Sequence, residues 1–137
     1  ITVHDELSVK SKKGKKIINV GQFQAIQPVA LDVEKDQYYL IITSSGYMLI
    51  EKINQIPIMP KGKGIKLINI PKASDETIIY LSVLNQDKNL EFNYSGRRPR
   101  QMTFSDLENF IMARTRRGKK IDKKFLLEKV KTTYNIK

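Results

Sequence analysis

Residues 60–70 read PKGKGIKLINI, and residues 10–20 read KSKKGKKIINV. With Gly14 aligned on Gly64, the apolar run IINV of the first copy falls on LINI of the second copy, at an offset of 50 residues. A third basic loop, RTRRGKKID at residues 114–122, places Gly118 another 54 residues along the chain and lacks the apolar run. A period of this length indicates a repeat architecture, in which small groups of elements stack on their neighbours.

The sequence between the basic loops is rich in β-branched and aromatic residues. Residues 38–43 (YYLIIT) and 47–50 (YMLI) predict two strands joined by a tight turn at Ser-Ser-Gly. Residues 78–84 (IIYLSVL) and 90–94 (LEFNY) flank a polar turn, so we expect a second hairpin there. The apolar run after each lysine-glycine loop predicts one more strand per unit. No alternation of strands with long helices is visible, which favours an all-β fold.

Each expected hairpin leads into a short segment with helical character. Residues 52–56 predict a single helical turn that Pro57 ends. Ser105 followed by Glu108 has the spacing of a capping box ahead of an apolar run. Units of this size and content are typical of propeller blades.

The expected organisation is one repeat domain with a short tail. Residues 1–122 are expected to form an all-β, propeller-like array, a partial one of about two to three blades with short helical turns. Residues 123–137 are expected to form a C-terminal tail, with a short amphipathic helix as one possibility.

The chain is strongly basic. Its 25 Lys and Arg residues against 14 Asp and Glu give a net charge of +11, and its pI is about 9.8. A charge of this size indicates a polyanionic partner, either nucleic acid or an anionic membrane surface, and says nothing about the fold. Residues 97–137 carry a net charge of +9, whereas residues 1–96 carry +2. The longest apolar stretches fall far short of the roughly 20 residues that cross a bilayer, so we expect no membrane-spanning segment.

Several kinds of chemistry are excluded by composition and spacing. The chain has no cysteine and one histidine, His4, so disulfides, thiolate metal sites and His-rich metal sites are excluded. The loop at residues 61–64 lacks the GxxxxGK[ST] spacing of a Walker A motif. The adjacent acids at 5–6 and 75–76 are interpreted as solvated turns rather than acid–base pairs. We therefore expect no catalytic residue, no metal and no cofactor in this chain.

The basic loops combine glycine with clustered cations. Glycine lets a phosphate approach the backbone closely, and flanking Lys and Arg residues neutralise phosphates and release counterions. Three such loops at matched positions of a repeat would recur along one rim and suit a long polyanion such as duplex DNA. The cations run in clusters, which favours contact with the phosphate backbone over base reading. The predicted DNA-binding residues are Lys12, Lys13, Lys15, Lys16, Lys61, Lys63, Lys66, Arg97, Arg98, Arg100, Arg114, Arg116, Arg117, Lys119 and Lys120.

Alternative interpretations of these cations stay open. A single lysine-rich turn is more often a solvated loop than a binding site. Arg97, Arg98 and Arg100 could instead protect an edge strand against aggregation. An RNA-binding β-protein would call for exposed aromatic side chains on which bases stack. A protein-interaction propeller could use a basic rim to meet an acidic partner.

Residues 39–71 (YLIITSSGYMLIEKINQIPIMPKGKGIKLINIP) resemble the C-terminal domain of the A subunit of bacterial topoisomerase IV, in the DNA gyrase and topoisomerase IV A-subunit family. The resemblance rests on a T-x-x-G hairpin, a turn ending in Ile-Pro and the KGKG loop with its apolar run. It continues through the strand at 88–94, the turn at 96–98, FSDLE at 104–108 and RTRRGKK at 114–120. It covers about residues 5–125.

This resemblance implies a β-pinwheel that binds duplex DNA on its outer rim and is not itself catalytic. The intact enzyme would be an ATP-dependent topoisomerase, bacterial, cytoplasmic and chromosome-associated, that uses ATP and Mg. Its active-site tyrosine would lie in the remainder of the A subunit, and ATP hydrolysis in the B subunit. The gyrase relative carries a Gln-Arg-Arg-Gly-Gly-Lys-Gly box, which residues 10–16 and 114–120 lack. Guidance of strand passage in decatenation and relaxation is therefore expected, rather than gyrase-like wrapping.

Overall fold

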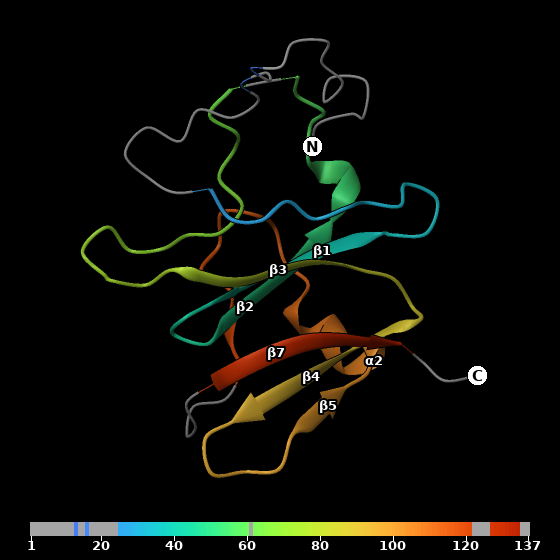
Figure 1. Ribbon diagram of the computed structural model, residues 1–137, viewed down its shortest axis with the longest axis vertical. Coiled ribbons are helices and arrows are strands. Elements are labelled where there is room, and N and C mark those ends of the chain that lie inside the picture. The colour runs from blue at the N-terminus through green and yellow to red at the C-terminus, as the bar shows by residue number, and fades with distance from the viewer. Residues whose placement is uncertain (1–12, 14–15, 17–24, 61, 122–126, 135–137) are drawn as a thin grey trace.

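The computed structural model describes residues 13, 16, 25–60, 62–121 and 127–134. Within them the chain forms two antiparallel sheets with little helix (Figure 1). The elements in chain order are β1 (Tyr38–Thr43), β2 (Tyr47–Lys52), η1 (Ile53–Gln55), β3 (Ile78–Leu84), β4 (Lys88–Tyr94), β5 (Arg100–Met102), α2 (Phe104–Leu107), η2 (Glu108–Phe110), β6 (Lys119–Lys120) and β7 (Leu127–Tyr134).

The first sheet has four strands in the order β3-β1-β2-β6, and the second has three in the order β5-β4-β7. The predicted hairpin of β1 and β2 is confirmed, and Gly46 at its turn adopts a φ of 77°. The all-β class is also confirmed by the two antiparallel sheets. The predicted second hairpin is wrong: a tight turn joins β3 to β4, but β3 pairs with β1 and β4 pairs with β5 and β7. The polar turn marks a crossover between sheets rather than a hairpin.

The strand pairings repeat at the offset seen in the basic loops. Tyr38 of β1 lies opposite Leu84 of β3, and Lys88 of β4 lies opposite Tyr134 of β7, each 50 positions later. Both pairings also contain a register shift near the same end, between Ile42 and Thr43 in β1 and one position further along in β4. Thus β4, β5 and β7 are the structural counterparts of β1, β2 and β3.

The C-terminal tail is a strand rather than a helix over its described part. β7 spans Leu127–Tyr134 and pairs along the whole of β4. Its apolar spacing suggested a helix, but the unpaired edge of β4 supplies a ladder of hydrogen bonds that the tail completes. The remaining residues of the predicted tail lie outside the described part of the chain.

The two faces of the β1–β2 hairpin are both buried, which explains its nearly continuous apolar sequence. Leu40, Ile42, Met48 and Ile50 join a core shared with the second sheet, where Phe92 is fully buried. The alternate residues of the same strands, Tyr39, Ile41 and Leu49, form a second core cluster with Ile68. Because side chains alternate across a strand, one hairpin serves both clusters.

Short helical segments occur at both places where the sequence predicted them. The predicted helical turn before Pro57 is confirmed as η1. The capping box before α2 is real but is formed by Thr103 and Asp106, not by Ser105 and Glu108. Residues 67–70, predicted as a strand, are irregular, because their backbone groups bond to a neighbouring loop rather than to a strand.

Candidate nucleic-acid interface

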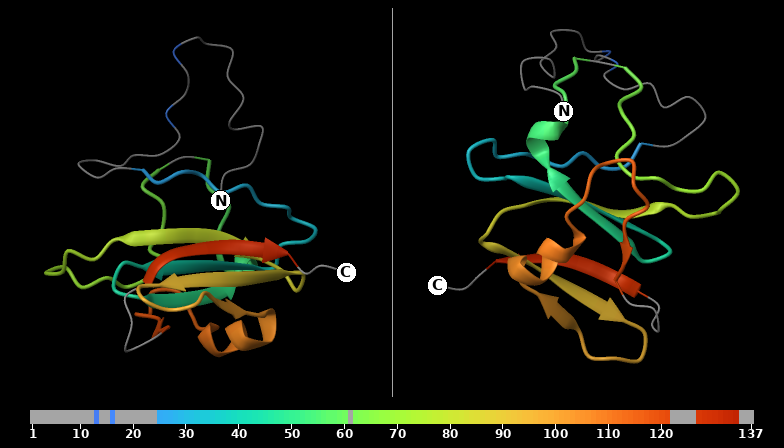
Figure 2. Two further views of the ribbon diagram at one scale, coloured as in Figure 1. Left: turned by 60° about the horizontal axis from the view of Figure 1, so that its bottom comes forward. Right: turned by 180° about the vertical axis from the view of Figure 1, so that it is seen from behind.

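The second and third basic loops lie side by side over the second core cluster. The Thr115 amide donates to the Leu67 carbonyl at 2.9 Å, and the Asn69 amide donates to the Arg116 carbonyl at 2.9 Å. Leu67, like Met112, packs against the buried face of the first sheet. The two segments, lime green and dark orange, run together in Figure 1 and in the right view of Figure 2. We call residues 63–69 and 114–117 the joined loops.

The joined loops present cations at their surface. Lys63, Lys66 and Arg116 are exposed. Arg114 is half-buried and donates from Nη1 to the Lys66 carbonyl at 3.4 Å, while the Lys66 ammonium donates to Oδ1 of Asn69 at 2.6 Å. Two clusters separated by almost 50 residues of sequence thus form one basic surface.

The third loop depends on a glycine for steric reasons. Gly118 has a φ of 86°, and a Cβ built on it would lie 2.6 Å from the carbonyl oxygen of Met48. No other residue type can bring the backbone this close to β2. Thr115, a β-branched residue, adopts a φ of 70°, a conformation that is rare for such side chains. Its amide hydrogen bond to Leu67 helps to hold it there.

Arg117 points inward instead of toward solvent. Its Nη2 lies 2.5 Å from Oε2 of Glu76, whose side chain is only 2% exposed. Its Nη1 donates to the Asn69 carbonyl at 3.4 Å, and its guanidinium sits 4.0 Å from the centre of the Tyr47 ring. Burial tends to raise the pKa of Glu76, but the adjacent Arg117 guanidinium and the nearby Thr43 side chain outweigh it, so the pKa lies below its ordinary value.

The last two cations of the third loop follow Gly118 in β6. Lys119 is exposed, and its ammonium donates to the Asn109 carbonyl at 2.6 Å. Lys120 is exposed, with its ammonium 5.2 Å from the centre of the Tyr47 ring.

The remaining predicted cations are not among residues 63–69 and 114–117, which make up the joined loops. Arg97, Arg98 and Arg100 are exposed at the turn into the edge strand β5. That turn lies at the bottom of Figure 1, away from the joined loops. Lys13 and Lys16 are exposed. The other predicted residues, Lys12, Lys15 and Lys61, lie outside the described residues.

Three residues of this region were missed by the sequence interpretation. Glu76, interpreted as part of a solvated turn, is instead paired with Arg117. Tyr47 belongs to the strand expected at residues 47–50, and its ring also faces two cations. Asn69 joins the loops through its backbone and side chain; the signal for it was the Ile-Asn pair repeated at positions 18–19 and 68–69.

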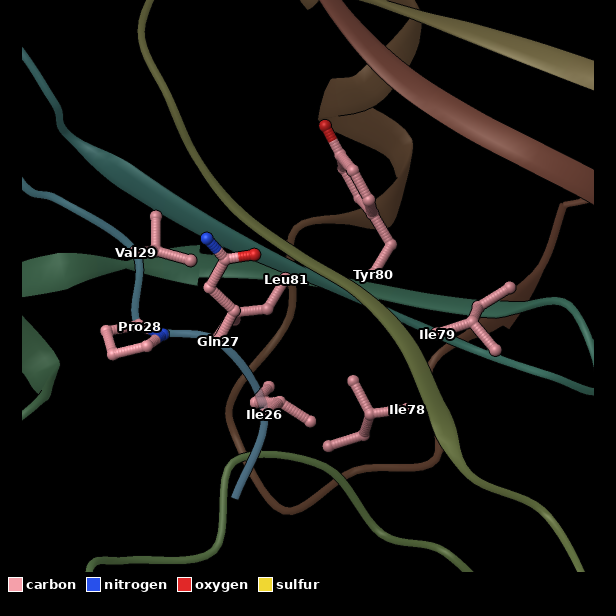
Figure 3. A pocket seen from close by; sticks show the side chains of 8 residues that line it. All are labelled: Ile26, Gln27, Pro28, Val29, Ile78, Ile79, Tyr80 and Leu81. Atoms are coloured by element: carbon pink, nitrogen blue, oxygen red, sulfur yellow. The ribbon is translucent and has the colours of Figure 1, made fainter. Parts of the chain in front are cut away.

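An apolar pocket of about 290 Å³ lies elsewhere, between residues 26–29 and residues 78–81 of β3 (Figure 3). Its side chains are aliphatic except for Gln27, Pro28 and Tyr80, and none is charged. Over the described part of the chain, no cluster of His, Cys, Asp or Glu side chains could hold a metal ion. No helix among those residues is long and apolar enough to cross a membrane.

Two antiparallel sheets whose strand pairings repeat after 50 residues, β1 with β3 and β4 with β7, define a β-pinwheel, a propeller-like domain. Residues 37–85 match the family described as DNA gyrase C-terminal domain, beta-propeller. The chain belongs to the family of C-terminal domains of the DNA gyrase and topoisomerase IV A subunits.

Individual relatives agree with this assignment. The chain is 33% identical over 119 residues to the A subunit of DNA topoisomerase 4 from Haemophilus influenzae, covering 83% of this chain and 16% of the relative. It is 32% identical over 128 residues to the corresponding protein of Pseudomonas aeruginosa, covering 88% and 17%. The chain thus spans about one sixth of the length of these relatives.

The solved structure of the E. coli ParC C-terminal domain is similar over most of the chain. It superposes with a TM-score of 0.83 at 27% identity and covers 98% of this chain and 56% of that one. A second structure, described as the C-terminal domain of DNA topoisomerase IV, gives a TM-score of 0.58 at 16% identity over 73% of this chain and 32% of that one, which supports the fold alone.

Proposed function

We propose that this chain is a non-catalytic, duplex-DNA-binding module of a type IIA topoisomerase, belonging to its A subunit. The observation that carries the proposal is the meeting of two repeat-related basic loops through backbone hydrogen bonds. Held together in this way, their exposed cations form a continuous surface rather than isolated solvated turns. Random surface charge has no reason to follow the register of a structural repeat.

The surface favours the DNA backbone over base edges. Duplex DNA carries one charge per roughly 1.7 Å of its axis, so adjacent cations can each meet a phosphate. The joined loops are irregular, and among the described residues neither a helix nor a long β-ribbon projects from them to enter a groove. We therefore expect little sequence specificity.

Single-stranded RNA is the less favoured ligand. Its specific recognition relies on exposed aromatic side chains on which unpaired bases stack. Among the described residues as far as Thr133, every Tyr and Phe side chain is buried or half-buried. The Tyr47 ring, which faces cations of the third loop, is covered by Arg117.

The family supports a proposal for the role of this domain in the intact protein. We propose that the domain guides DNA segments during decatenation and relaxation by a bacterial, cytoplasmic, chromosome-associated topoisomerase. Cleavage would belong to the remainder of the A subunit, and ATP hydrolysis with Mg to a B subunit. The absence of a Gln-Arg-Arg-Gly-Gly-Lys-Gly box favours guidance over tight wrapping.

Fluorescence anisotropy with a mixed-sequence duplex of about 30 base pairs, at several salt concentrations, tests the proposal. The logarithm of affinity should fall linearly with the logarithm of salt concentration, by about 0.9 per phosphate contact. Because of this slope, each phosphate contact makes the affinity at 0.1 M salt about eightfold higher, relative to 1 M salt, than it would be without that contact. Undetectable binding at 50 mM salt, or binding that is independent of salt, would contradict the proposal.

A charge-matched pair of double variants locates the surface. Lys63→Ala with Arg116→Ala removes two exposed cations of the joined loops, and Lys35→Ala with Lys129→Ala removes two exposed cations elsewhere. The first variant should lose about 1.8 from the slope and the second much less. Equal losses would show that general charge, rather than the joined loops, drives binding. A parallel titration with single-stranded RNA identifies the preferred nucleic acid.

A further inference from the structure

Among the described residues, one carboxylate, that of Glu76, forms an ion pair with the third basic loop. Residues 114–120 contain five cations and no acid, and like charges at such spacing repel one another. Among the ion pairs between described residues, only that of Arg117 with Glu76 reaches this loop. The other described pairs join Lys35 to Asp32, Lys88 to Asp36 and Lys131 to Glu91.

The ion pair sits where three parts of the chain meet. Glu76 precedes β3, Tyr47 begins β2, and Arg117 belongs to the third basic loop. The Arg117 guanidinium contacts the carboxylate of Glu76, the ring of Tyr47 and the carbonyl of Asn69. With its donors engaged on two sides and its face on an aromatic ring, this guanidinium has a fixed position.

The orientation of Arg116 depends on the fixed position of its neighbour, Arg117. Arg116 is exposed. Its carbonyl accepts a hydrogen bond from the amide of Asn69, and the carbonyl of Asn69 accepts one from the guanidinium of Arg117. On the other side, Gly118 is pressed against the backbone of Met48. Anchors at the carbonyl of Arg116 itself and at the two residues that follow it therefore restrict the direction in which its side chain leaves the loop.

We propose that Glu76 is a positioning residue for DNA binding: by fixing Arg117 inside the fold, it orders the third basic loop so that Arg116 and its neighbours meet the phosphates. This inference rests on the proposed function. It also removes Arg117 from the set of DNA contacts and makes it the inner anchor of the loop.

The inference predicts an effect on DNA affinity opposite to the one usually expected when an acid is neutralised. Neutralising an acid on a DNA-binding protein raises the net positive charge and should strengthen binding. Neutralising Glu76 should instead weaken it, because the loop loses its anchor. If Arg117 were a phosphate contact restrained by Glu76, the same substitution would free it and affinity would rise.

Asp75 provides a matched control beside Glu76. It is exposed and has the same charge, so Asp75→Asn and Glu76→Gln change the net charge equally at adjacent positions. Anisotropy at 0.1 M salt should show about an eightfold loss for Glu76→Gln, with a slope reduced by about 0.9, the value of one phosphate contact. Asp75→Asn should bind as tightly as the unsubstituted protein or more tightly.

Hydrogen exchange supplies a readout that needs no DNA. The amides of Thr115 and Asn69 make the two hydrogen bonds between the joined loops, and both should exchange faster in Glu76→Gln and at an unchanged rate in Asp75→Asn. Faster exchange of core amides in β1 as well would indicate general destabilisation and would count against a local positioning role.

Tyr47→Leu keeps the proposal testable if Glu76→Gln does not fold. It removes the ring beneath Arg117 without changing any charge, and it should reduce affinity in the same direction. Binding equal to that of the unsubstituted protein would overturn the inference. So would tighter binding by Glu76→Gln than by Asp75→Asn. Failure of the unsubstituted protein to bind duplex DNA would instead refute the proposed function, so the two failures are distinguishable.

Discussion

Replacing Gly118 with alanine introduces two separate costs that the structure allows us to estimate. The backbone at this position has a φ of 86°, and an L-residue in the left-handed region costs about 1–2 kcal/mol. The new Cβ would also lie 2.6 Å from the Met48 carbonyl oxygen and 2.9 Å from its carbonyl carbon. Relieving such an overlap by backbone displacement costs roughly 1–3 kcal/mol.

The free energy of unfolding should therefore fall by about 2–5 kcal/mol. For a chain of this size, 1 kcal/mol corresponds to a shift of about 3 °C in the melting temperature, so Gly118→Ala should melt about 6–15 °C lower. The strained segment includes the pairing of β6 with β2 and the hydrogen bond from the Ile121 amide to the Gly46 carbonyl. Exchange of the Ile121 amide should accelerate for this reason.

Gly96 gives the matched control. Its φ is 69°, and nothing lies within 4 Å of a Cβ built on it. Gly96→Ala should therefore show only the conformational cost, about 1–2 kcal/mol. Thermal unfolding followed by circular dichroism measures both variants. Equal melting temperatures for Gly118→Ala and Gly96→Ala, with no change in Ile121 exchange, would refute the steric argument.

Other predictions concern the core and its buried charges. Phe92→Ala should lower the free energy of unfolding by about 3–5 kcal/mol in urea titrations, because this fully buried ring fills the core between the sheets. Lys88→Met should cost about 2–4 kcal/mol, because it leaves the Asp36 carboxylate, 4% exposed, without its ion-pair partner at 2.8 Å; a change within 0.5 kcal/mol would contradict this. Acid should destabilise the fold. Burial tends to raise the pKa of Asp36 and Glu76, but the Lys88 and Arg117 interactions lower it below the ordinary value. Their stabilisation is therefore complete at neutral pH and is lost as pH falls through the folded-state pKa values. Urea titrations between pH 7 and pH 3 measure it, and a free energy of unfolding that stays constant over that range would contradict this reasoning.

The repeat was the most informative pattern in the sequence. The 50-residue offset between the first two lysine-glycine loops reappears in the strand register, from Tyr38–Leu84 to Lys88–Tyr134. The apolar runs also indicated the strands of the first hairpin correctly. These features depend on local residue type and on spacing along the chain, which a sequence displays directly.

The pairing of strands was predicted less well. A polar turn between two apolar runs is typical of a hairpin, yet the turn between β3 and β4 joins two different sheets. Local sequence cannot distinguish these cases, because the free edges of β1 and β4 compete for the same strand. The tail was misjudged for the same reason, since its strand exists through pairing with β4.

The chain's sequence by itself determined the repeat, the β character, the excess of positive charge and the glycines that its basic loops require. Only the tertiary structure decided which of those charges act together. In the folded chain, two loops almost 50 residues apart are joined, and Arg117 points inward to Glu76. The sequence did not indicate this ion pair, because an Asp-Glu pair in a polar stretch is typical of a solvated turn. The physical reason is that an ion pair forms between groups that are close in space and desolvated together, and both conditions arise only when the chain is folded.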